Sequence, residues 1–524
     1  MSFKKFLLSL ATIMTCVNIY SQVTISQNSF IPRPFSMDMA REIMAEQSAW
    51  AYMLDNTRWF GTIQAIAQYN GGIRSTKSTG LGALPFWNYS NKMTVGRNSF
   101  GNTTAYDLDS YQLGLGDTIN SGLISLSPQV YSAGINFFLF TGPHETKPGF
   151  FGKINIPCCT LSIDPQFKEI NQVIGQTYAK GEMNTASLNA ALAFPIYTTI
   201  AQAFAGGAIA GSPTGSAFKG LEFGIIDSKQ TSLLRFGDID LAIGYNFLVN
   251  DRSHIGAGIR LSCPTGNKPT AIYVLEPIVG NGGHWGIGGE IMGHTIIWEG
   301  HDDKSIEFWF DGQAQHLFKS MQFRSFDLLQ NGPGSKYLLV KDLSPDGKTS
   351  QQLIQPFINL SSLRVFSTVG IVFDAALLLQ MVYHNWQLGI GYNFAGKSTE
   401  SLALLDKLAI GRYIVNGQQP NESAATATLL GDPSAKINAA MPSAQGAGVL
   451  GSYAINIQGN SALNIQDAQL VGGCSSKVFL QSVYSWLHTD YCPLIAAQLS
   501  IEFSQSNNNA LSQWGIGLRG GFSF

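Results

Sequence analysis

Long runs with strictly alternating apolar and polar residues constrain this chain more than any other feature. In the last run, 513–524, aromatic and aliphatic side chains fall on one face and small or polar side chains on the other. Comparable runs occupy 127–140, 238–249, 284–298, 305–318, 370–383, 386–394 and 494–503. They are longer than the roughly five or six residues of ordinary strands. That length suits tilted strands that cross a bilayer.

Composition agrees with strands that have one face in lipid. Charged residues make up 13% of the chain, against roughly 25% in soluble proteins. The mean hydropathy is nevertheless only +0.07, as expected when apolar and polar residues alternate. Lipid requires every backbone polar group to be paired, so such a sheet must close into a barrel. The formal net charge of -2 indicates no nucleic-acid partner.

The N-terminal residues predict a secretory signal peptide over 1–21. Lys4 and Lys5 precede the apolar run FLLSLATIMTCV, and polar residues follow, with cleavage expected near Ser21. Acylation of Cys16 is the alternative, but the preceding Ile-Met-Thr is a poor context for it. We therefore expect an exported protein.

The whole pattern resembles bacterial outer-membrane β-barrels of the porin class, without matching a particular subfamily. In that class an aromatic residue ends the last strand and is read by the barrel-assembly machinery. The resemblance implies that Leu518, Phe522 and Phe524 form this assembly signal. It also implies location in the outer membrane of a Gram-negative-type bacterium, with lipid as a partner and a homo-oligomer as a possibility.

We expect an all-β fold, a transmembrane antiparallel barrel of about fourteen strands, with twelve to eighteen acceptable and an even number required. Residues 22–85 are predicted to be an N-terminal helical segment, because DMAREIMAEQSAWAYML has helical spacing. This segment is interpreted as a plug, a periplasmic piece or a lid. Residues 86–524 are assigned to the barrel, with long external loops near 165–218 and 395–474. A transmembrane helix within 183–218 is the weaker alternative for the first loop, despite the G-x-x-x-G pair at Gly207 and Gly211.

Strand direction follows from placing Phe524 at the periplasmic end. The block 395–474 and the segment QSNNNA then lie outside, and the turns at His384-Asn385 and Thr489 lie on the periplasmic side. The stretches VNDRS and GNGG are also predicted to be tight turns.

Two motifs point elsewhere and are rejected. The glycines of WGIGLRGGFSF match a dinucleotide-binding fingerprint, but the chain ends before any helix can follow. The segment GYNFAGKS matches a phosphate-binding loop, but its strand alternates, and the other IGYNF copy, at 243–247, lacks the Lys-Ser pair. Sequences typical of serine hydrolases and zinc proteases do not occur. We expect no enzyme, no catalytic, cofactor or metal site, and we leave open whether Cys474 and Cys492 form a disulfide.

Charged residues on the polar faces of the strands are the candidate functional residues. They should face the lumen, because burial in lipid would cost about 2–4 kcal/mol for a basic residue. The candidates are Asp238, Asp240, Arg260, Glu290, Glu307, Asp374, Glu502 and Arg519. They form either an ion-paired wall or a constriction that selects solutes by charge and size.

The leading functional hypothesis is a porin-like channel for passive diffusion of small hydrophilic solutes. The first alternative is a plugged, substrate-specific transporter, with a hydrophobic compound as one possible substrate and residues 36–69 in the lumen. The second is a structural or adhesive surface protein that binds through its long loops.

Overall fold

The structure, a computed structural model, closes the long strands into a twelve-stranded antiparallel barrel. It describes residues 33–50, 60–73, 92–96, 106–115, 122–142, 147–170, 197, 199–206, 217–250, 252–301, 304–345, 350–416, 435–438, 457–486, 489, 491–504 and 512–524. The prediction of an all-β barrel is confirmed, with a strand number at the lower end of the expected range.

The barrel strands pair with their neighbours around the ring, and β25 closes it by pairing with β1. In order around the ring they are β1 (Phe60–Gly72), β5 (Gln129–Gly142), β6 (Gly149–Asp164), β11 (Ile239–Asn250), β12 (Ser253–Cys263), β13 (Gly286–Glu299), β14 (Lys304–Ser325), β18 (Ser362–Tyr383), β19 (Trp386–Lys397), β23 (Gly473–Ser485), β24 (Cys492–Ser504) and β25 (Gln513–Ser523). The barrel therefore begins at Phe60, inside the segment 22–85 that the sequence assigned to a helical domain. The expected start at residue 86 is too late, because β1 alternates outward Ile63 and Tyr69 with inward Gln64 and Gln68.

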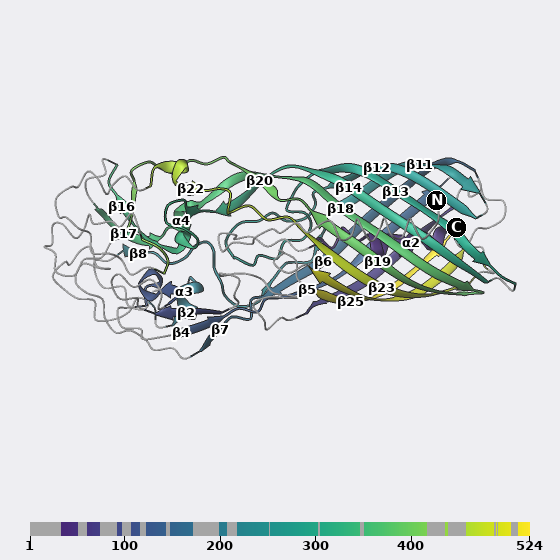
Figure 1. Cartoon of the computed structure of the whole chain (residues 1–524), viewed down its shortest axis with the longest axis horizontal. Helices are drawn as coiled ribbons and strands as arrows, with labels where there is room; N and C mark the ends of the chain where they lie inside the picture. Colours follow the sequence, from purple (N-terminus) through teal and green to yellow (C-terminus); the bar gives the residue numbers. More distant parts are fainter. Residues whose placement is uncertain are drawn as a thin grey trace, which may run out of the picture.

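Short turns join the strands at one end of the barrel, and long connections join them at the other (Figure 1). The turns at 250–253 and 383–386 lie at the short-turn end, together with Phe524, whose backbone pairs with Gly61. Residues 398–416 and 457–472, which belong to the predicted external block 395–474, lie beyond the other end, as expected from the strand directions. GNGG does not form a tight turn between strands. It lies within the long connection between β12 and β13, where Gly280, Gly282 and Gly283 have positive φ angles.

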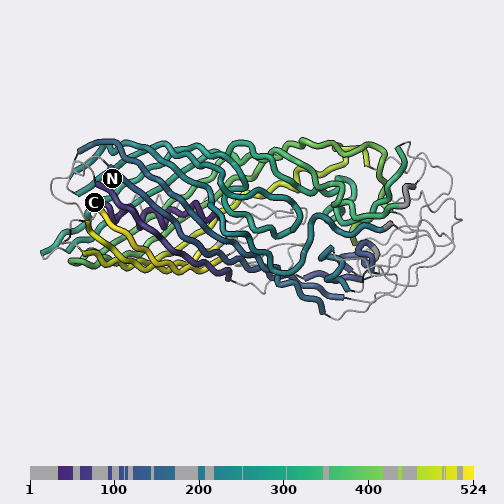
Figure 2. The backbone as a smooth tube through the Cα atoms, turned by 180° about the vertical axis from the view of Figure 1, so that it is seen from behind, coloured from purple at the N-terminus to yellow at the C-terminus, as the bar shows by residue number. Residues whose placement is uncertain are grey.

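The long connections fold into a cap beyond one end of the barrel (Figures 1 and 2). The cap contains two small four-stranded sheets and short helices. Its elements are β2 (Lys92–Gly96), β3 (Leu108–Asp109), η1 (Ser110–Leu113), β4 (Gly122–Ser125), β7 (Lys168–Ile170), α3 (Ile200–Phe204), β8 (Ala217–Phe218), β15 (Asp327–Leu328), η2 (Ser335–Tyr337), β16 (Leu339–Leu343), β17 (Ser350–Pro356), α4 (Ile358–Ser361), β21 (Tyr413–Val415), η3 (Gly459–Ala462) and β22 (Leu463–Asn464). Three short strands extend the barrel sheet instead: β9 (Gln230–Thr231) and β10 (Arg235–Phe236) pair with β6, and β20 (Glu400–Leu404) pairs with β18.

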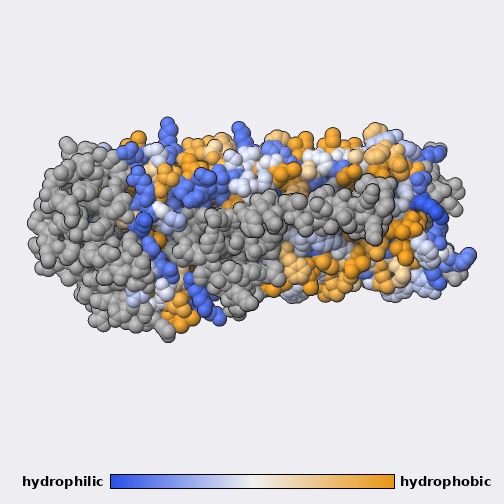
Figure 3. Space-filling view, in the orientation of Figure 1, coloured by the Kyte–Doolittle hydropathy of each residue, from blue (hydrophilic) through white to orange (hydrophobic). Residues whose placement is uncertain are grey.

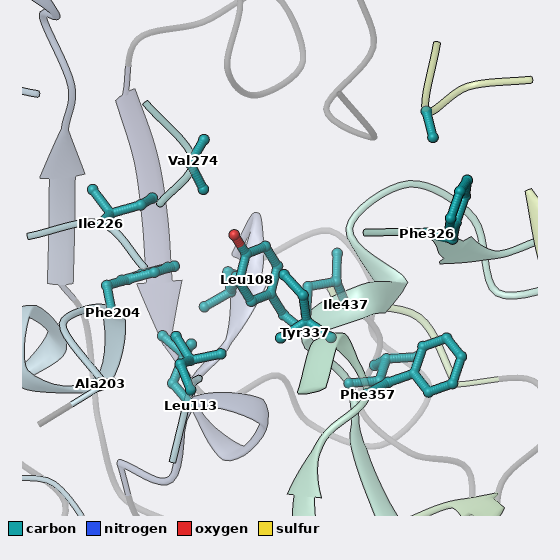
Figure 4. Packing of buried hydrophobic residues seen from close by; sticks show 14 of the residues in the cluster. Leu108, Leu113, Ala203, Phe204, Ile226, Val274, Phe326, Tyr337, Phe357 and Ile437 are labelled. Carbon is teal, nitrogen blue, oxygen red and sulfur yellow. The ribbon is translucent and has the colours of Figure 1, made fainter. Parts of the chain in front are cut away.

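A hydrophobic core of its own holds the cap together (Figure 4). Phe204, Phe326, Tyr337 and Phe357 are buried there among aliphatic side chains from several connections. Because these segments are far apart in the sequence, the cap depends on the barrel to bring them together.

The outer surface of the barrel is apolar, as Figure 3 shows by the orange side chains gathered over the strands. Along β25, Trp514, Ile516, Leu518 and Phe522 are exposed, while Arg519 between them is buried. A β-bulge after Asn246 shifts this alternation in β11, so Leu248 is exposed although the sequence pattern placed it inside. An apolar exterior around a polar interior is the arrangement that a lipid bilayer requires of a barrel.

One helix, α2 (Met39–Trp50), occupies the inside of the barrel (Figures 1 and 2). Its segment consists mostly of good helix formers, and Glu42 lies in the first turn, where the helix dipole favours an acid. All twelve of its residues are buried. The helix contacts β1, β5, β14, β18 and β19, strands that lie on different sides of the ring.

Candidate functional site

The lumen of the barrel is filled by residues 33–50, which we call the plug. Polar and charged side chains from the strands bind the plug along its length. Charged contacts hold the plug at Arg33 and Asp38, before the helix, and at Glu42 and Glu46 within it, and ring contacts hold Trp50 at its end.

Arg260 on β12 forms the central contact. Its guanidinium binds both carboxylate oxygens of Glu42 on α2, at 2.5 and 2.7 Å. It also lies 3.3 Å from Asp240 and 3.4 Å from Glu290. Three of the residues predicted from the sequence therefore meet at the guanidinium that binds Glu42 of the plug.

Lys153 on β6 forms the second contact from the same side. Its ammonium group pairs with Glu46 of α2 and lies 3.3 Å from Glu290 and 3.5 Å from Asp311. Both basic side chains on this side of the lumen are thus shared between the plug and wall carboxylates.

Arg33, just before the helix, reaches the opposite wall. Its guanidinium donates to Asp374 at 2.5 Å, to Asn393 at 2.6 Å and to Glu502 at 3.3 Å. Nearby, Lys477 pairs with Asp38 of the plug at 2.9 Å. The two predicted acids Asp374 and Glu502 are therefore brought together by a plug residue.

The other three predicted residues have separate roles. Arg519 donates to the main-chain oxygen of Met44 in α2. Glu307 accepts hydrogen bonds from Trp309 and from Ser305, both at 3.0 Å.

Asp238 lies just before β11, in the connection to the cap. It accepts from the backbone amides of Asn281 at 2.5 Å and Gly266 at 3.4 Å. It thus anchors the connection between β12 and β13 and has no contact with the plug.

Aromatic rings close the short-turn end of the lumen. The indole of Trp50, the last residue of α2, stacks on His254 with ring centroids 3.7 Å apart and meets Phe60 edge-on at 4.7 Å. His294, cross-strand from His254, stacks on Trp309 at 4.4 Å. The C-terminal end of the plug is therefore held by ring packing, whereas its N-terminal end is held by charges.

A partly open cavity lies at the other end of the plug, below the cap, and the volume open to the centre of a water molecule is about 90 Å³. Its lining is mainly apolar, with Met37, Leu317, Val369, Val372 and Leu470 among the lining side chains. Arg33 and Asp374 also line it, so the cavity reaches the charged end of the plug.

Two adjacent strand irregularities create this cavity. The pairing of β14 with β18 shifts register around Leu317, and β18 changes its partner from β19 to β20 between Val372 and Val369. Such bulges invert which side chains face inward, and here they turn aliphatic residues into the lumen.

His284 supports one wall of the cavity. Its Nδ1 donates to the carbonyl oxygen of Phe318 at 2.6 Å, and its Nε2 accepts from Gln322 at 3.0 Å. Burial lowers the pKa of His284 below its ordinary value of 6.5, although the hydrogen bond to Phe318 opposes the shift. The neutral imidazole is therefore the form that fits this wall.

Several important residues were not found by sequence reasoning. Lys153 lies on β6, a strand interrupted by Pro157 and therefore not recognised. Asp311 lies on a recognised strand, and its spacing of four from Glu307 would have placed it on the same inward face. Arg33 and Glu42 could not be assigned to the lumen without knowing that the helix lies there.

Cys474 and Cys492 do not form a disulfide with each other. They lie at opposite ends of β23 and β24, since Cys474 lies opposite Gly396 and Cys492 opposite Ser523. The phosphate-loop lookalike GYNFAGKS is mostly strand, with β19 running to Lys397.

In the part of the chain that the structure describes, no helix has the length and apolar character needed to cross a membrane. Most of 183–218, where such a helix was the alternative, lies outside the described residues; the described part contains α3, five residues long.

Comparisons with known proteins give limited information. No family model and no curated protein matches the chain. Among solved structures, it is similar to an outer-membrane channel from Pseudomonas putida F1, with 10% identity and a TM-score of 0.36, covering 90% of this chain and 98% of that one. A Pseudomonas aeruginosa FadL homologue gives 8% identity and a TM-score of 0.28, covering 96% and 98% of the two chains. The Pseudomonas putida toluene transporter TodX gives 8% and 0.25, covering 96% and 97%. At these scores the likenesses carry no argument, and the barrel is established by its own strand pairing.

Proposed function

We propose that this protein is a plugged outer-membrane channel for small solutes with an apolar body. The observation that carries the proposal is the plug itself: α2 is buried on all sides within the lumen and is tied to strands on opposite sides of it. Free diffusion through an open pore, the leading hypothesis from the sequence, does not fit a lumen filled in this way. The plugged transporter, the alternative hypothesis, fits it directly.

The apolar character of the solute is inferred from the cavity. Its lining brings Met37, Leu317, Val369 and Val372 together as a buried cluster between cap and plug. A cavity lined largely by apolar side chains, with few polar groups, is the usual form of a binding site for a small organic molecule. Its place at the external end of the plug makes it the position where a solute waits before the plug moves.

The proposed location is the outer membrane, reached by export with the predicted signal peptide. The apolar outer surface and the aromatic residues at both of its margins, such as Trp514 and Tyr383, support it. The barrel-assembly machinery, outer-membrane lipid and small solutes remain the proposed partners, and a homo-oligomer remains a possibility.

Conductance across a planar lipid bilayer tests the plug. The full chain should give small or rare current steps, whereas a chain that lacks 33–50 should give large, stable steps. The deletion must end before Phe60, because a deletion of 36–69 would remove most of β1 and break the barrel. Heat-modifiable mobility in SDS gels shows whether each barrel is folded.

Each outcome separates the hypotheses. Equal conductance of the two chains would mean that the helix does not close the lumen, and an open porin would be the better description. A folded barrel that conducts in neither form would favour the structural or adhesive alternative. That alternative rests on the cap, a folded body built from the long connections with its own core.

A further inference from the structure

Asp374 is a buried carboxylate whose positively charged partner comes from the plug. Among the described residues, its one salt bridge is with Arg33, at 2.5 Å. Its other contacts are the backbone amide of Met39, at 3.0 Å, and the side-chain amide of Asn393, at 2.5 Å. Two of these three partners therefore belong to the plug, and only Asn393 belongs to the wall.

The position of Asp374 makes this dependence relevant to the solute. Arg33 and Asp374 line the apolar cavity together with Met37, Val369 and Val372. The cavity thus combines an apolar wall with a carboxylate at its plug end, and Lys397 and Glu400 also line it. In the closed state the guanidinium of Arg33 satisfies that carboxylate.

Movement of the plug would change the charge balance at this point. Asp374 would lose both Arg33 and the Met39 amide and would keep only the side-chain amide of Asn393, so its negative charge would lack a partner of opposite sign. Glu502, the second acid bound by Arg33, would keep Ser475, Gln513 and Lys477 on the wall. Asp374 is therefore the group that needs a replacement cation.

We propose that the channel takes apolar cations, such as aliphatic or aromatic amines, whose ammonium group replaces Arg33 on Asp374. This inference rests on the proposed function and names the substrate class of the same cavity. The plug then opens at low cost only when a cation enters, because the solute supplies the charge that the plug removes. Arg33 acts as the chain's own stand-in for the substrate.

The rest of the lumen wall is consistent with a cationic solute. Buried charged residues on the barrel strands comprise the acids Asp240, Glu290, Glu307, Asp311, Asp374 and Glu502 and the bases Lys153, Arg260, Arg324, Lys477 and Arg519. The acids outnumber the bases by one, so the wall bears a small negative excess, which attracts cations and repels anions.

Three probes of nearly equal size test the proposal: cyclohexylmethylammonium, cyclohexylmethanol and cyclohexanecarboxylate. Their binding to the full chain in detergent micelles at neutral pH is measured by calorimetry. The ammonium should bind about tenfold more tightly than the alcohol, a difference typical of one charge-assisted contact. The carboxylate should bind most weakly.

Variants assign the effect to Asp374. Asp374→Asn should abolish the preference for ammonium and leave binding of the alcohol nearly unchanged. Arg33→Met should increase ammonium affinity, because the carboxylate no longer has an internal partner. Glu299→Gln, an exposed carboxylate at the opposite end of the barrel, is the matched control and should keep the preference.

The outcomes distinguish failure of this inference from failure of the proposed function. Equal binding of ammonium and alcohol, or a preference that survives in Asp374→Asn, would overturn the substrate class while leaving an apolar-solute channel. If none of the probes bound to the full chain or to the chain without 33–50, the apolar-solute function itself would be wrong.

Discussion

At the scale of single residues, the interior of the barrel is a network of charges shared between the wall and the plug. Arg260 shows this most clearly, since its guanidinium contacts Glu42 of the plug as well as Asp240 and Glu290 of the wall. The exposed pair of Arg252 with Glu299 has a similar separation, 2.8 Å, but both of its side chains are more than half exposed. The two arginines provide a matched comparison.

Arg260→Met should release the plug and leave the barrel closed. Removal of one partner of a buried ion pair costs about 3–5 kcal/mol, since the remaining acids keep uncompensated charge. Arg252→Met should cost no more than about 1 kcal/mol. The measurement is bilayer conductance, with gel mobility as the test of folding. If the two variants conducted alike, the charge network would not be what holds the helix.

The buried imidazole of His284 should make the free energy of unfolding depend on pH. Its pKa is lowered by burial, so the folded state favours the neutral ring. A base with a lowered pKa contributes stability above its unfolded value, 6.5, and that stability is lost as the pH falls toward the lower folded value. Protonation of Nε2 would also remove the acceptor for Gln322.

The free energy of unfolding should therefore decrease between about pH 7 and pH 5, and less so in His284→Gln. His301→Gln, at an exposed turn residue at the other end of the barrel, is the control and should follow the unmodified chain. A pH profile unaffected by His284→Gln would show that this ring is not the titrating group. Denaturant unfolding at a series of pH values gives the comparison.

At the scale of elements, α2 is held at its two ends by different forces. The first turn is bound by ion pairs, whereas the last residue, Trp50, is packed between His254 and Phe60. The indole lies in a core that also contains Phe140 and Phe151. Loss of the ring should thus loosen the C-terminal end of the helix while the ion pairs remain.

Trp50→Ala should destabilise docking of the plug by about 3–5 kcal/mol, the usual effect of removing a large buried aromatic side chain. Hydrogen exchange of the α2 amides should become faster, starting from the C-terminal turn. Trp298→Ala removes an indole that is 51% exposed on the barrel surface and should leave α2 protected. Unchanged exchange in Trp50→Ala would mean that the ion pairs alone hold the helix.

The sequence predicted elements well where a period of two was uninterrupted. It located β11, β18, β19, β24 and β25, since lipid outside and polar groups inside impose alternation. It missed β6, where Pro157 and two cysteines interrupt the pattern, and β1, whose outward alanines are weakly apolar. The helical character of the residues that form α2 was predicted correctly.

The candidate site could be predicted only in part. Alternation selected Asp240, Arg260 and Glu290 as inward residues, and all three are buried. It could not show that Arg260 binds Glu42, because nothing local to a helix tells whether it lies inside a barrel. The cavity could not be predicted from the sequence either. It depends on strand bulges near Leu317 and Val369, and its lining combines Arg33 with Asp374, more than 300 residues apart.

At the scale of the whole molecule, the structure contains two separate cores. One lies in the lumen around α2, and the other lies in the cap. Phe326 belongs to the second core and is fully buried there (Figure 4). The two bodies are joined by β14 and β18, whose 22 residues each extend from the barrel into the cap. Separate cores predict that the cap can loosen while the barrel and its plug stay intact.

Phe326→Ala should test this independence. The substitution should destabilise the cap by about 3–5 kcal/mol, visible as faster hydrogen exchange in η2, β16 and α4. Conductance and gel mobility should not change, because the ion pairs of the plug lie in the other core. Leu329→Ala, at a residue that is 57% exposed, is the control for loss of an apolar side chain from the cap. A rise in conductance with Phe326→Ala would show instead that the cap holds the plug closed, and the two bodies would then act as one gate.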